Sequence, residues 1–369
     1  MTVAVGGQRI FVRTVPAQER PFVLFPSVGE YPVYDDAVYD AFDAPDRRMH
    51  AYRSAIAAAA PGRTVLDIGT GRDALWAVAA ARAGARHVYA IEAQPGAAAQ
   101  ARRAVAGHGL TGRITVIEAR STAVRLPEPA QVCVSEIIGN VASAEGVIAA
   151  LADARRRLCA PDCVWIPARA QTWVAAVSWP ASSAAGEPDH AVAAESLPYL
   201  RRIFESVGHP FDLRLCLAGP VADLRISSAA AVESLTFGNA GEPPPANARG
   251  TTGLTIDAGR ARLTGLVLWT RVAVSPGTAQ IDALTGDTRG WAPVYAPLSL
   301  TGLPVRRGDR LRVTFERRTS DDGVHPDYRL TVALPDDPGT EALSWTSPHH
   351  GHEFRRTPLY RHLFPQPRP

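Results

Sequence analysis

Short apolar runs alternate with alanine-rich helical patterns between about residues 64 and 170. The runs have the length and composition of buried strands, and they span 63–69, 86–93, 113–119 and 131–136. The helical patterns span 74–85, 94–109 and 145–158. Strands that alternate with crossover helices predict a parallel, doubly wound sheet, an α/β fold of the Rossmann type. Such sheets bind ligands at the carboxyl ends of their strands, so we look for a site there.

The pattern changes after about residue 170. Short alternating strands, among them 260–274 and 309–318, are separated by turns rich in glycine and proline. This texture predicts an antiparallel sandwich or barrel, of which we expect the β-barrel. The segment 198–215 is amphipathic, with Leu200, Ile203 and Phe204 at helical spacing. We expect it to be a helical arm that packs on a second copy of the chain as a homodimer.

These changes of pattern divide the chain into three parts. Residues 1–60 are expected to form an N-terminal segment with a helix that covers the cofactor. Residues 61–170 are expected to form the cofactor-binding Rossmann-like domain. Residues 171–369 are expected to form the substrate domain, a β-barrel that carries the arm.

Composition excludes several classes of protein. The chain has 369 residues, 46% of them apolar and 20% charged, as in soluble globular proteins. The net charge is only +3, with arginines spread along the chain, so we expect no nucleic-acid partner. The chain has no apolar run of about 18 residues and its start does not resemble a secretory signal, so we expect no membrane association. Four scattered cysteines indicate reduced thiols in a cytoplasmic protein and complete no metal site.

All 39 basic residues are arginine, because the sequence contains no lysine. Schiff-base chemistry and a phosphate-binding P-loop both need a lysine, so both are excluded.

A cofactor site is predicted where the first strand turns into a helix. Asp67, Gly69 and Gly71 occupy this turn, and glycines there let the backbone approach a ligand closely. Glu92 ends the next strand, where an acid can accept both hydroxyls of a ribose. A dinucleotide and S-adenosylmethionine both satisfy this arrangement. Asp73 at the helix start would repel a pyrophosphate, so S-adenosylmethionine is favoured.

The fourth strand ends in an unusual loop, Ser135-Glu-Ile-Ile-Gly-Asn-Val-Ala-Ser-Ala-Glu145, with acids nine residues apart at Glu136 and Glu145. With the preceding cofactor segment, this loop resembles the double-glutamate loop of the protein arginine methyltransferases. The segments 31–36, 48–56, 163–177 and 291–298 resemble further motifs of that family in the same order. The chain therefore resembles a divergent bacterial-type member, from about Tyr31 to beyond residue 315.

The resemblance implies roles for residues that spacing alone does not single out. Arg48 falls where the family's arginine grips the cofactor carboxylate. Tyr31 and Tyr34 lie in the aromatic segment that covers cofactor and substrate, and Trp291 lies in the substrate-binding loop of the barrel. The family's adenine-contacting acid is replaced here by Ser121 or Thr122, of which we take Thr122.

The two glutamates suit a cationic acceptor. A guanidinium is planar and permanently charged, and two carboxylates can hold both of its edges. Glu136 and Glu145 are therefore the predicted catalytic residues of an S-adenosylmethionine-dependent N-methyltransferase. The usual Thr-His-Trp motif of the family reads Arg289-Gly290-Trp291 here, which favours a small guanidino molecule, free arginine or an arginine peptide over a protein. The alternatives are a natural-product methyltransferase acting on another amine or hydroxyl, and a non-catalytic methyltransferase-like binding subunit.

Overall fold

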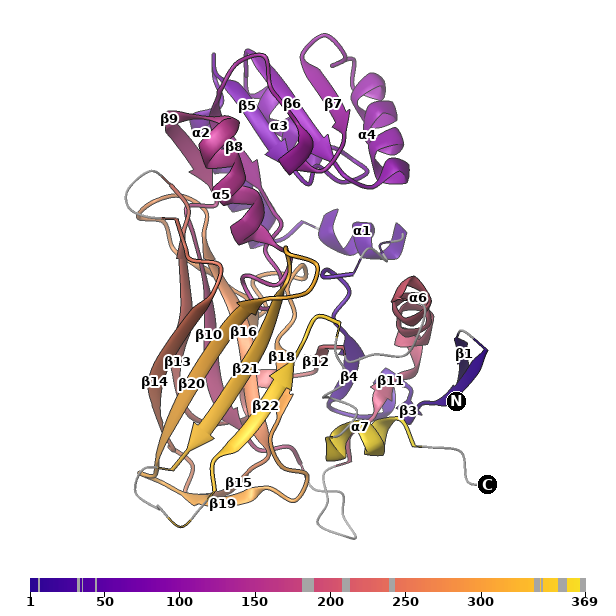
Figure 1. The fold of residues 1–369 in the computed structure, drawn as a ribbon, viewed down its shortest axis with the longest axis vertical. Helices are drawn as coiled ribbons and strands as arrows, with labels where there is room; N and C mark the ends of the chain where they lie inside the picture. Colours follow the sequence, from indigo (N-terminus) through magenta and orange to yellow (C-terminus); the bar gives the residue numbers. More distant parts are fainter. Residues whose placement is uncertain are drawn as a thin grey trace.

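The computed structural model describes residues 1–365, except 6, 32–33, 35, 44, 181–188, 208–212, 239–242, 335–338, 340 and 351–356. It divides into two units (Figure 1). A parallel sheet with its helices forms one end of the molecule, and antiparallel sheets extend away from it. The helix α1, Asp36–Asp43, lies between the two units.

The parallel sheet confirms the doubly wound prediction. Its strands follow the order β7-β6-β5-β8-β9 and all its pairs are parallel. The strands are β5 Thr64–Ile68, β6 His87–Glu92, β7 Ile114–Glu118, β8 Ala130–Ser135 and β9 Cys159–Ile166. The helices are α2 Arg47–Ala59, α3 Leu75–Arg82, α4 Pro95–Gly107 and α5 Val147–Arg157. Every residue of β5 is buried, as expected of a central strand covered on both faces. The strand order reverses between β5 and β8, which is where such sheets bind ligands.

The second unit consists mainly of antiparallel sheets, and the expected closed β-barrel is not confirmed. A nine-stranded sheet has the order β13-β10-β16-β18-β12-β4-β11-β3, with β17 paired to β16, and a separate four-stranded sheet has the order β14-β20-β21-β22. No ladder among the described residues closes these sheets on each other. Apolar side chains from both sheets, such as Leu268 and Leu330, share one core. The antiparallel strands themselves were predicted correctly, but which edges pair is set by contacts distant in sequence.

The sequence run 260–274, which reads as one strand, forms two strands that are separated at Thr264. The strands of the unit are β3 Thr14–Val15, β4 Val23–Pro26, β10 Arg169–Val177, β11 Val192–Ala193, β12 Leu215–Ala218, β13 Arg225–Thr236, β14 Ala248–Thr255, β15 Arg260–Leu263, β16 Gly265–Ala273, β17 Ile281–Asp282, β18 Val294–Pro297, β19 Leu303–Arg306, β20 Arg310–Thr319, β21 Pro326–Ala333 and β22 Leu343–Ser347. The short strands β15 and β19 pair with each other.

The N-terminal 60 residues are shared between the two units. A hairpin of β1, Thr2–Val5, and β2, Gln8–Phe11, precedes β3 and β4, and these two join the nine-stranded sheet. The helix α2 then packs on α3 and β9 of the parallel unit. The predicted N-terminal segment is therefore a connection that begins in one unit and ends in the other.

The proposed arm begins with the helix α6, Leu197–Val207, and ends at β12, with residues 208–212 outside the described part. Leu200, Ile203 and Phe204 are fully buried within this single chain. The helix contacts β1, and Phe204 lies against Phe364, just beyond the C-terminal helix α7, Pro358–Leu363. The apolar face that the sequence offers to a second copy is thus covered internally, because residues at the two ends of the chain pack on it.

Across the described residues, no helix is both long enough and apolar enough to cross a lipid bilayer.

Candidate active site

The site is built around the carboxyl ends of β5 and β8. The turn after β5 contains Gly69 and Gly71, which have φ values of +77° and +67°. These values lie in the left-handed region, where glycine carries no steric penalty. A Cβ on Gly69 would lie 2.8 Å from Ile137 Cγ2 in the loop after β8. The two strand ends therefore fit together only because this position has no side chain.

Glu92, at the end of β6, is tied to the glycine turn. Its Oε2 accepts a hydrogen bond from the Gly71 backbone N–H at 3.0 Å, and its Oε1 accepts one from Gln94 N at 2.8 Å. The residue is 8% exposed. The predicted ribose acceptor thus lies directly beside the predicted turn.

Asp67 is fully buried at the end of β5. Its Oδ2 accepts a hydrogen bond from Thr70 Oγ1 at 2.6 Å. Burial raises the pKa of Asp67 to about 7, and the Thr70 hydrogen bond opposes that shift. Asp67 therefore stabilises the turn through Thr70.

A cavity that is partly open to solvent begins at this turn. Its lining brings together the predicted Tyr34, Arg48, Gly71, Glu136 and Glu145. Further lining residues that sequence reasoning did not assign include Tyr39, Phe42, Arg72 and Trp76. The aromatic walls of this cavity and the Glu92 carboxylate beside Gly71 suit a nucleoside joined to an amino acid.

Glu136 is held by two donors. The Arg48 guanidinium forms an ion pair with its Oε1, and Trp76 Nε1 donates a hydrogen bond to its Oε2 at 2.8 Å. Burial raises the pKa of Glu136, while Arg48 and Trp76 oppose that shift. Arg48 is itself buried and also donates to the Phe42 carbonyl. The arginine that the resemblance assigns to the cofactor is therefore oriented, in this structure, toward the first glutamate.

Glu145 lies on the same cavity without a cationic partner in the contacts of the described residues. Burial, followed by the charge of Glu136, raises its pKa well above the usual range of a carboxyl group. A Cβ on Gly29 would lie 2.1 Å from Glu145 Oε1, so the chain passes directly over this carboxylate. Two acids thus share one cavity in which, among the described residues, Arg48 pairs with Glu136 and no cation pairs with Glu145.

The loop between the two glutamates is anchored by the antiparallel sheets. Thr270 Oγ1 donates to the Gly139 carbonyl at 2.8 Å, and Ser143 Oγ donates to Glu233 Oε1 at 2.8 Å. The Glu233 carboxylate is also paired with the buried Arg317. No local motif marks Glu233, Thr270 or Arg317, because each lies in an ordinary strand pattern far along the chain.

Trp291 takes part in the same anchoring. It is 4% exposed, and its Nε1 donates to the Ile138 carbonyl at 2.8 Å. The next residue, Ala292, donates its backbone N–H to Asn140 Oδ1 at 2.7 Å. Trp291 therefore lies behind the double-glutamate loop and does not line the cavity.

The two predicted tyrosines are separated. Tyr34 lines the cavity, and its hydroxyl donates to the Gly29 carbonyl at 3.2 Å. Tyr31 is 3% exposed and stacks on His349, with ring centroids 5.5 Å apart. Thr122 lies in an exposed 3₁₀ turn, Ser121–Ala123, where its carbonyl accepts from Arg157. Tyr31 and Thr122 are therefore not brought to the cavity wall.

Arg72, which the sequence did not single out, connects α1 to the glycine turn. Its guanidinium pairs with Asp36 and Asp40 of α1 and with Asp73, and it lies over the Tyr39 ring at 4.9 Å from the centroid. The partners on α1 are distant in sequence, so only the fold reveals them. These ion pairs hold α1 beside the glycine turn after β5.

The fold is a Rossmann-like unit joined to an antiparallel unit, with the cavity at the carboxyl ends of β5 and β8. The family model for ribosomal protein L11 methyltransferase (PrmA) matches residues 52–166, which include Glu92, Glu136 and Glu145. The cofactor of this methyltransferase family is S-adenosylmethionine.

Sequence relatives of the chain include arginine methyltransferases. The chain is 42% identical over 114 residues to an arginine N(omega)-methyltransferase of Streptomyces achromogenes subsp. streptozoticus, a match that covers 30% of this chain and 31% of the relative. It is 38% identical over 133 residues to the protein arginine N-methyltransferase PRMT10 of Oryza sativa subsp. japonica, covering 35% and 34%. The matched segment thus spans about a third of each relative.

Solved structures extend the likeness in fold to most of the chain. Protein arginine methyltransferase 10 of Arabidopsis thaliana has a TM-score of 0.63 at 21% identity, covering 84% of this chain and 96% of that one. The PRMT1 enzyme–prozyme complex of Trypanosoma brucei has a TM-score of 0.62 at 19% identity, covering 85% and 98%. At 21% and 19% identity these likenesses show the fold alone, and the sequence matches cover about a third of the chain.

Proposed function

We propose that this protein is an S-adenosylmethionine-dependent N-methyltransferase that acts on a guanidino nitrogen of arginine. The observation that carries the proposal is the pair Glu136 and Glu145 on one buried cavity beside the cofactor turn. These two largely enclosed carboxylates are electrostatically incomplete, because Glu136 is paired with Arg48 while Glu145 pairs with no cation of the described residues, and a substrate guanidinium completes them.

The residues of the chain fit the demands of the reaction. The bound cofactor supplies a methyl group on a positively charged sulfur. Guanidinium nitrogens are poor nucleophiles because their lone pairs are delocalised. Glu136, fixed by Arg48 and Trp76, holds one edge of the substrate guanidinium, and Glu145 holds another edge. This pairing turns one nitrogen toward the methyl group and localises positive charge on the others, and such orientation is worth several kcal/mol of barrier.

Glu145 also suits the removal of a proton. The attacking nitrogen carries one hydrogen too many once the new N–C bond has formed, and that proton must leave. Burial and the charge of Glu136 give Glu145 a raised pKa, so this carboxylate is a better proton acceptor than an ordinary glutamate. A neutral hydroxyl acceptor would gain nothing from this pair of charges, and a purely binding subunit would not need them.

The acceptor is proposed to be free arginine, an arginine peptide or a small biosynthetic intermediate, in preference to a protein. The support is indirect. Arg289 and Gly290 precede Trp291 where the family usually carries Thr-His, and the net charge of +3 provides no general attraction for basic protein tails. We further propose that the protein works as a homodimer.

One labelling experiment tests reaction and acceptor together. Methyl-labelled S-adenosylmethionine is incubated with the protein, free arginine, an arginine peptide and an arginine–glycine-rich protein in one tube, and the products are weighed by mass spectrometry. Labelling on a guanidino nitrogen of the small acceptors is expected. Labelling of the protein alone would overturn the acceptor choice, and no guanidino labelling anywhere would overturn the function.

The glutamate pair is tested by Glu136→Gln and Glu145→Gln. Each amide keeps the shape of the side chain but removes the charge, so turnover should fall by at least about a hundredfold. Affinity for S-adenosylhomocysteine, measured by calorimetry, should change little in Glu145→Gln. A variant that keeps most of its turnover on the labelled acceptor would contradict the mechanism.

A further inference from the structure

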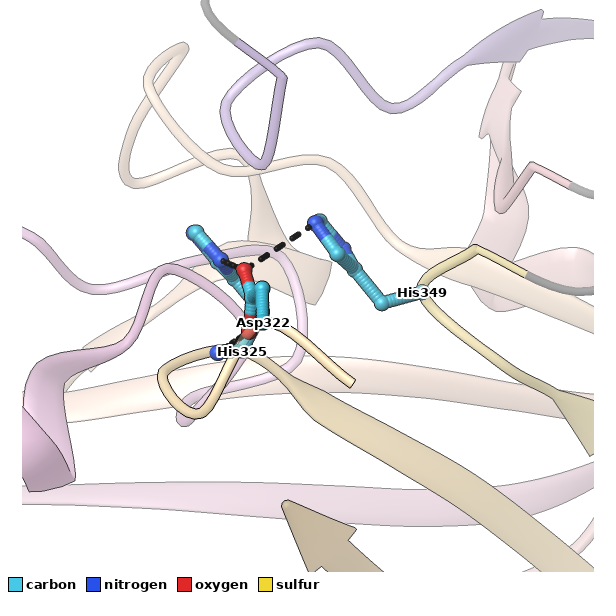
Figure 2. Close-up of side chains that lie close together, drawn as sticks. All are labelled: Asp322, His325 and His349. Carbon is cyan, nitrogen blue, oxygen red and sulfur yellow. Dashed lines mark hydrogen bonds and ion pairs between the residues drawn. The ribbon is translucent and has the colours of Figure 1, made fainter. Parts of the chain in front are cut away.

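A second cluster of metal-binding residue types lies outside the cavity. Asp322 and His325 belong to the turn between β20 and β21, and His349 follows β22 (Figure 2). The candidate ligand atoms of these three side chains all lie within 4.8 Å of one another. Asp322, His325 and His349 are spread over 28 residues of sequence, and the pairing of β20, β21 and β22 brings them together. No spacing motif predicted the cluster for that reason.

The carboxylate of Asp322 is oriented by its own turn. Its Oδ1 accepts hydrogen bonds from Ser320 Oγ at 2.9 Å and from the backbone N–H groups of Val324 and His325, both at 2.8 Å. The other oxygen, Oδ2, is left facing the two imidazole rings. It lies 2.5 Å from His325 Nδ1 and 3.7 Å from His349 Nε2. Metal-binding carboxylates are fixed in the same way by surrounding donors.

His349 is also held in place. Its backbone N–H donates to Asp327 Oδ1 at 2.7 Å, its ring stacks on Tyr31, and the side chain is 4% exposed. Its Nδ1 is buried and has no hydrogen-bond partner among the described residues.

The contact between His349 and Asp322 is too long for a hydrogen bond and suits an ion between the atoms. Protein N–H···O hydrogen bonds span about 2.7–3.2 Å. Two ligands of a tetrahedral zinc ion, at about 2.0–2.2 Å from the metal, lie about 3.4 Å apart. The separation of 3.7 Å is close to that value. The His325–Asp322 contact must lengthen by about 1 Å, and the His325 ring, now within 10° of parallel to His349, must tilt. His325 is 26% exposed, which gives it room to do so.

The surrounding charge favours a cation. Among the described residues, Asp321 and Asp327 lie close to Asp322 and the histidines, and the Arg214 guanidinium near His349 is itself paired with Glu30. Asp321 is paired with a third histidine, His350, whose ring centroid is 4.2 Å from that of His349. A set of imidazoles with one carboxylate is typical of Zn²⁺ and similar transition metals, whereas Ca²⁺ and Mg²⁺ prefer oxygen ligands alone.

We propose that Asp322, His325 and His349 form a binding site for a divalent transition-metal ion, Zn²⁺ being the best fit. The ion would tie the β20–β21 turn to the end of β22. A Cβ on Gly146 would lie 2.6 Å from Val324 Cγ1, so this turn presses on the residue next to Glu145. The ion would therefore stabilise the turn that packs against Gly146, the residue next to Glu145. The proposal does not depend on the proposed methyl transfer.

Calorimetry tests the site directly. The full chain carrying Cys159→Ser, which removes one free thiol as a competing ligand, is treated with a chelator, dialysed and titrated with ZnCl₂. One equivalent of Zn²⁺ should bind with a dissociation constant of about 1 μM or below, and the melting temperature should rise with bound metal. Failure to bind one equivalent would overturn the proposal.

Variants locate the binding. His325→Gln and Asp322→Asn each lie at a partly exposed position, and each should weaken Zn²⁺ binding at least about tenfold. His87→Gln, in the parallel unit, is the control and should bind Zn²⁺ as the parent does. Circular dichroism confirms that each variant is folded. Unchanged binding in both His325→Gln and Asp322→Asn would place the metal elsewhere and overturn the assignment.

Discussion

Trp76 shows how a single hydrogen bond tunes the proposed catalytic pair. Its ring is 4% exposed and stacks on Tyr52 with centroids 4.9 Å apart, so the indole N–H is aimed at Glu136 by packing. Trp76→Phe should keep most of the packing and lose the hydrogen bond. Because that bond favours the ionised carboxylate, its loss raises the pKa of Glu136.

The expected result is a shift of the acidic limb of the pH–rate profile to higher pH by about one pH unit, since a hydrogen bond to a charged group contributes about 1.5–3 kcal/mol. Trp165→Phe is the matched control. Trp165 is similarly buried, but its indole nitrogen has no hydrogen-bond partner among the described residues. Equal pH profiles for the two variants would remove Trp76 from this role.

A second prediction for a single residue concerns Glu92. Glu92→Ala should weaken the binding of S-adenosylhomocysteine by about 1.5–3 kcal/mol, because two ribose hydroxyls lose a charged acceptor and Gly71 loses its contact. Glu118→Ala is the control, since Glu118 is the partner of Glu92 on the neighbouring strand and pairs only with exposed Arg102 in the described contacts. Calorimetry that finds equal affinities for the two variants would exclude Glu92 as the ribose acceptor.

Sequence reasoning succeeds for residues at strand ends and fails for residues defined by packing. Glu92, Glu136 and Glu145 lie at or after the ends of apolar runs, so the sequence alone places them at one edge of a sheet. Trp76 and Arg72 also line the cavity, but an aromatic residue in a helix and an arginine in a turn have many ordinary uses. Trp291 was assigned to the substrate, whereas the fold places it behind the loop.

Among the elements, the segment after β4 has the tightest fit to the site. Gly29 passes so close to Glu145 that any side chain must displace the carboxylate. Gly29→Ala should therefore lower turnover at least about tenfold by moving Glu145, while the binding of S-adenosylhomocysteine stays nearly unchanged.

Gly259→Ala provides the control for this substitution, because a Cβ there would meet no atom within 4 Å. A Gly29→Ala variant as active as Gly259→Ala would show that Glu145 does not need its present position.

The elements of the parallel sheet were predictable because each buried strand and helix carries its own local pattern. The antiparallel unit was less so. Local alternation predicted its strands, but it could not predict whether the sheets close into a barrel, since that depends on edge pairing between distant segments. The placing of β3 and β4 in the same sheet as β12 and β18 could not be read from residues 1–60 at all.

At the scale of the whole molecule, we proposed a homodimer, which depends on contacts between two chains. The apolar residues of α6 are buried within one chain, so an interface there must use the exposed face of the helix, which includes Arg201 and Glu205. We expect a dimer by light scattering coupled to size exclusion, and partial dissociation at high salt because exposed ion pairs are screened. A monomer at every concentration would contradict the expectation.

The pairing of β4 with β12 also sets an order of events during synthesis. Pro26 is paired with Leu215, so β4 leaves the ribosome roughly 190 residues before its partner does. At about 5–20 residues per second, that interval is roughly 10–40 s. Tyr34 follows β4 and lines the cavity, and the strands that anchor the double-glutamate loop are synthesised later still. The parallel sheet can therefore assemble on the nascent chain well before the acceptor side of its active site exists.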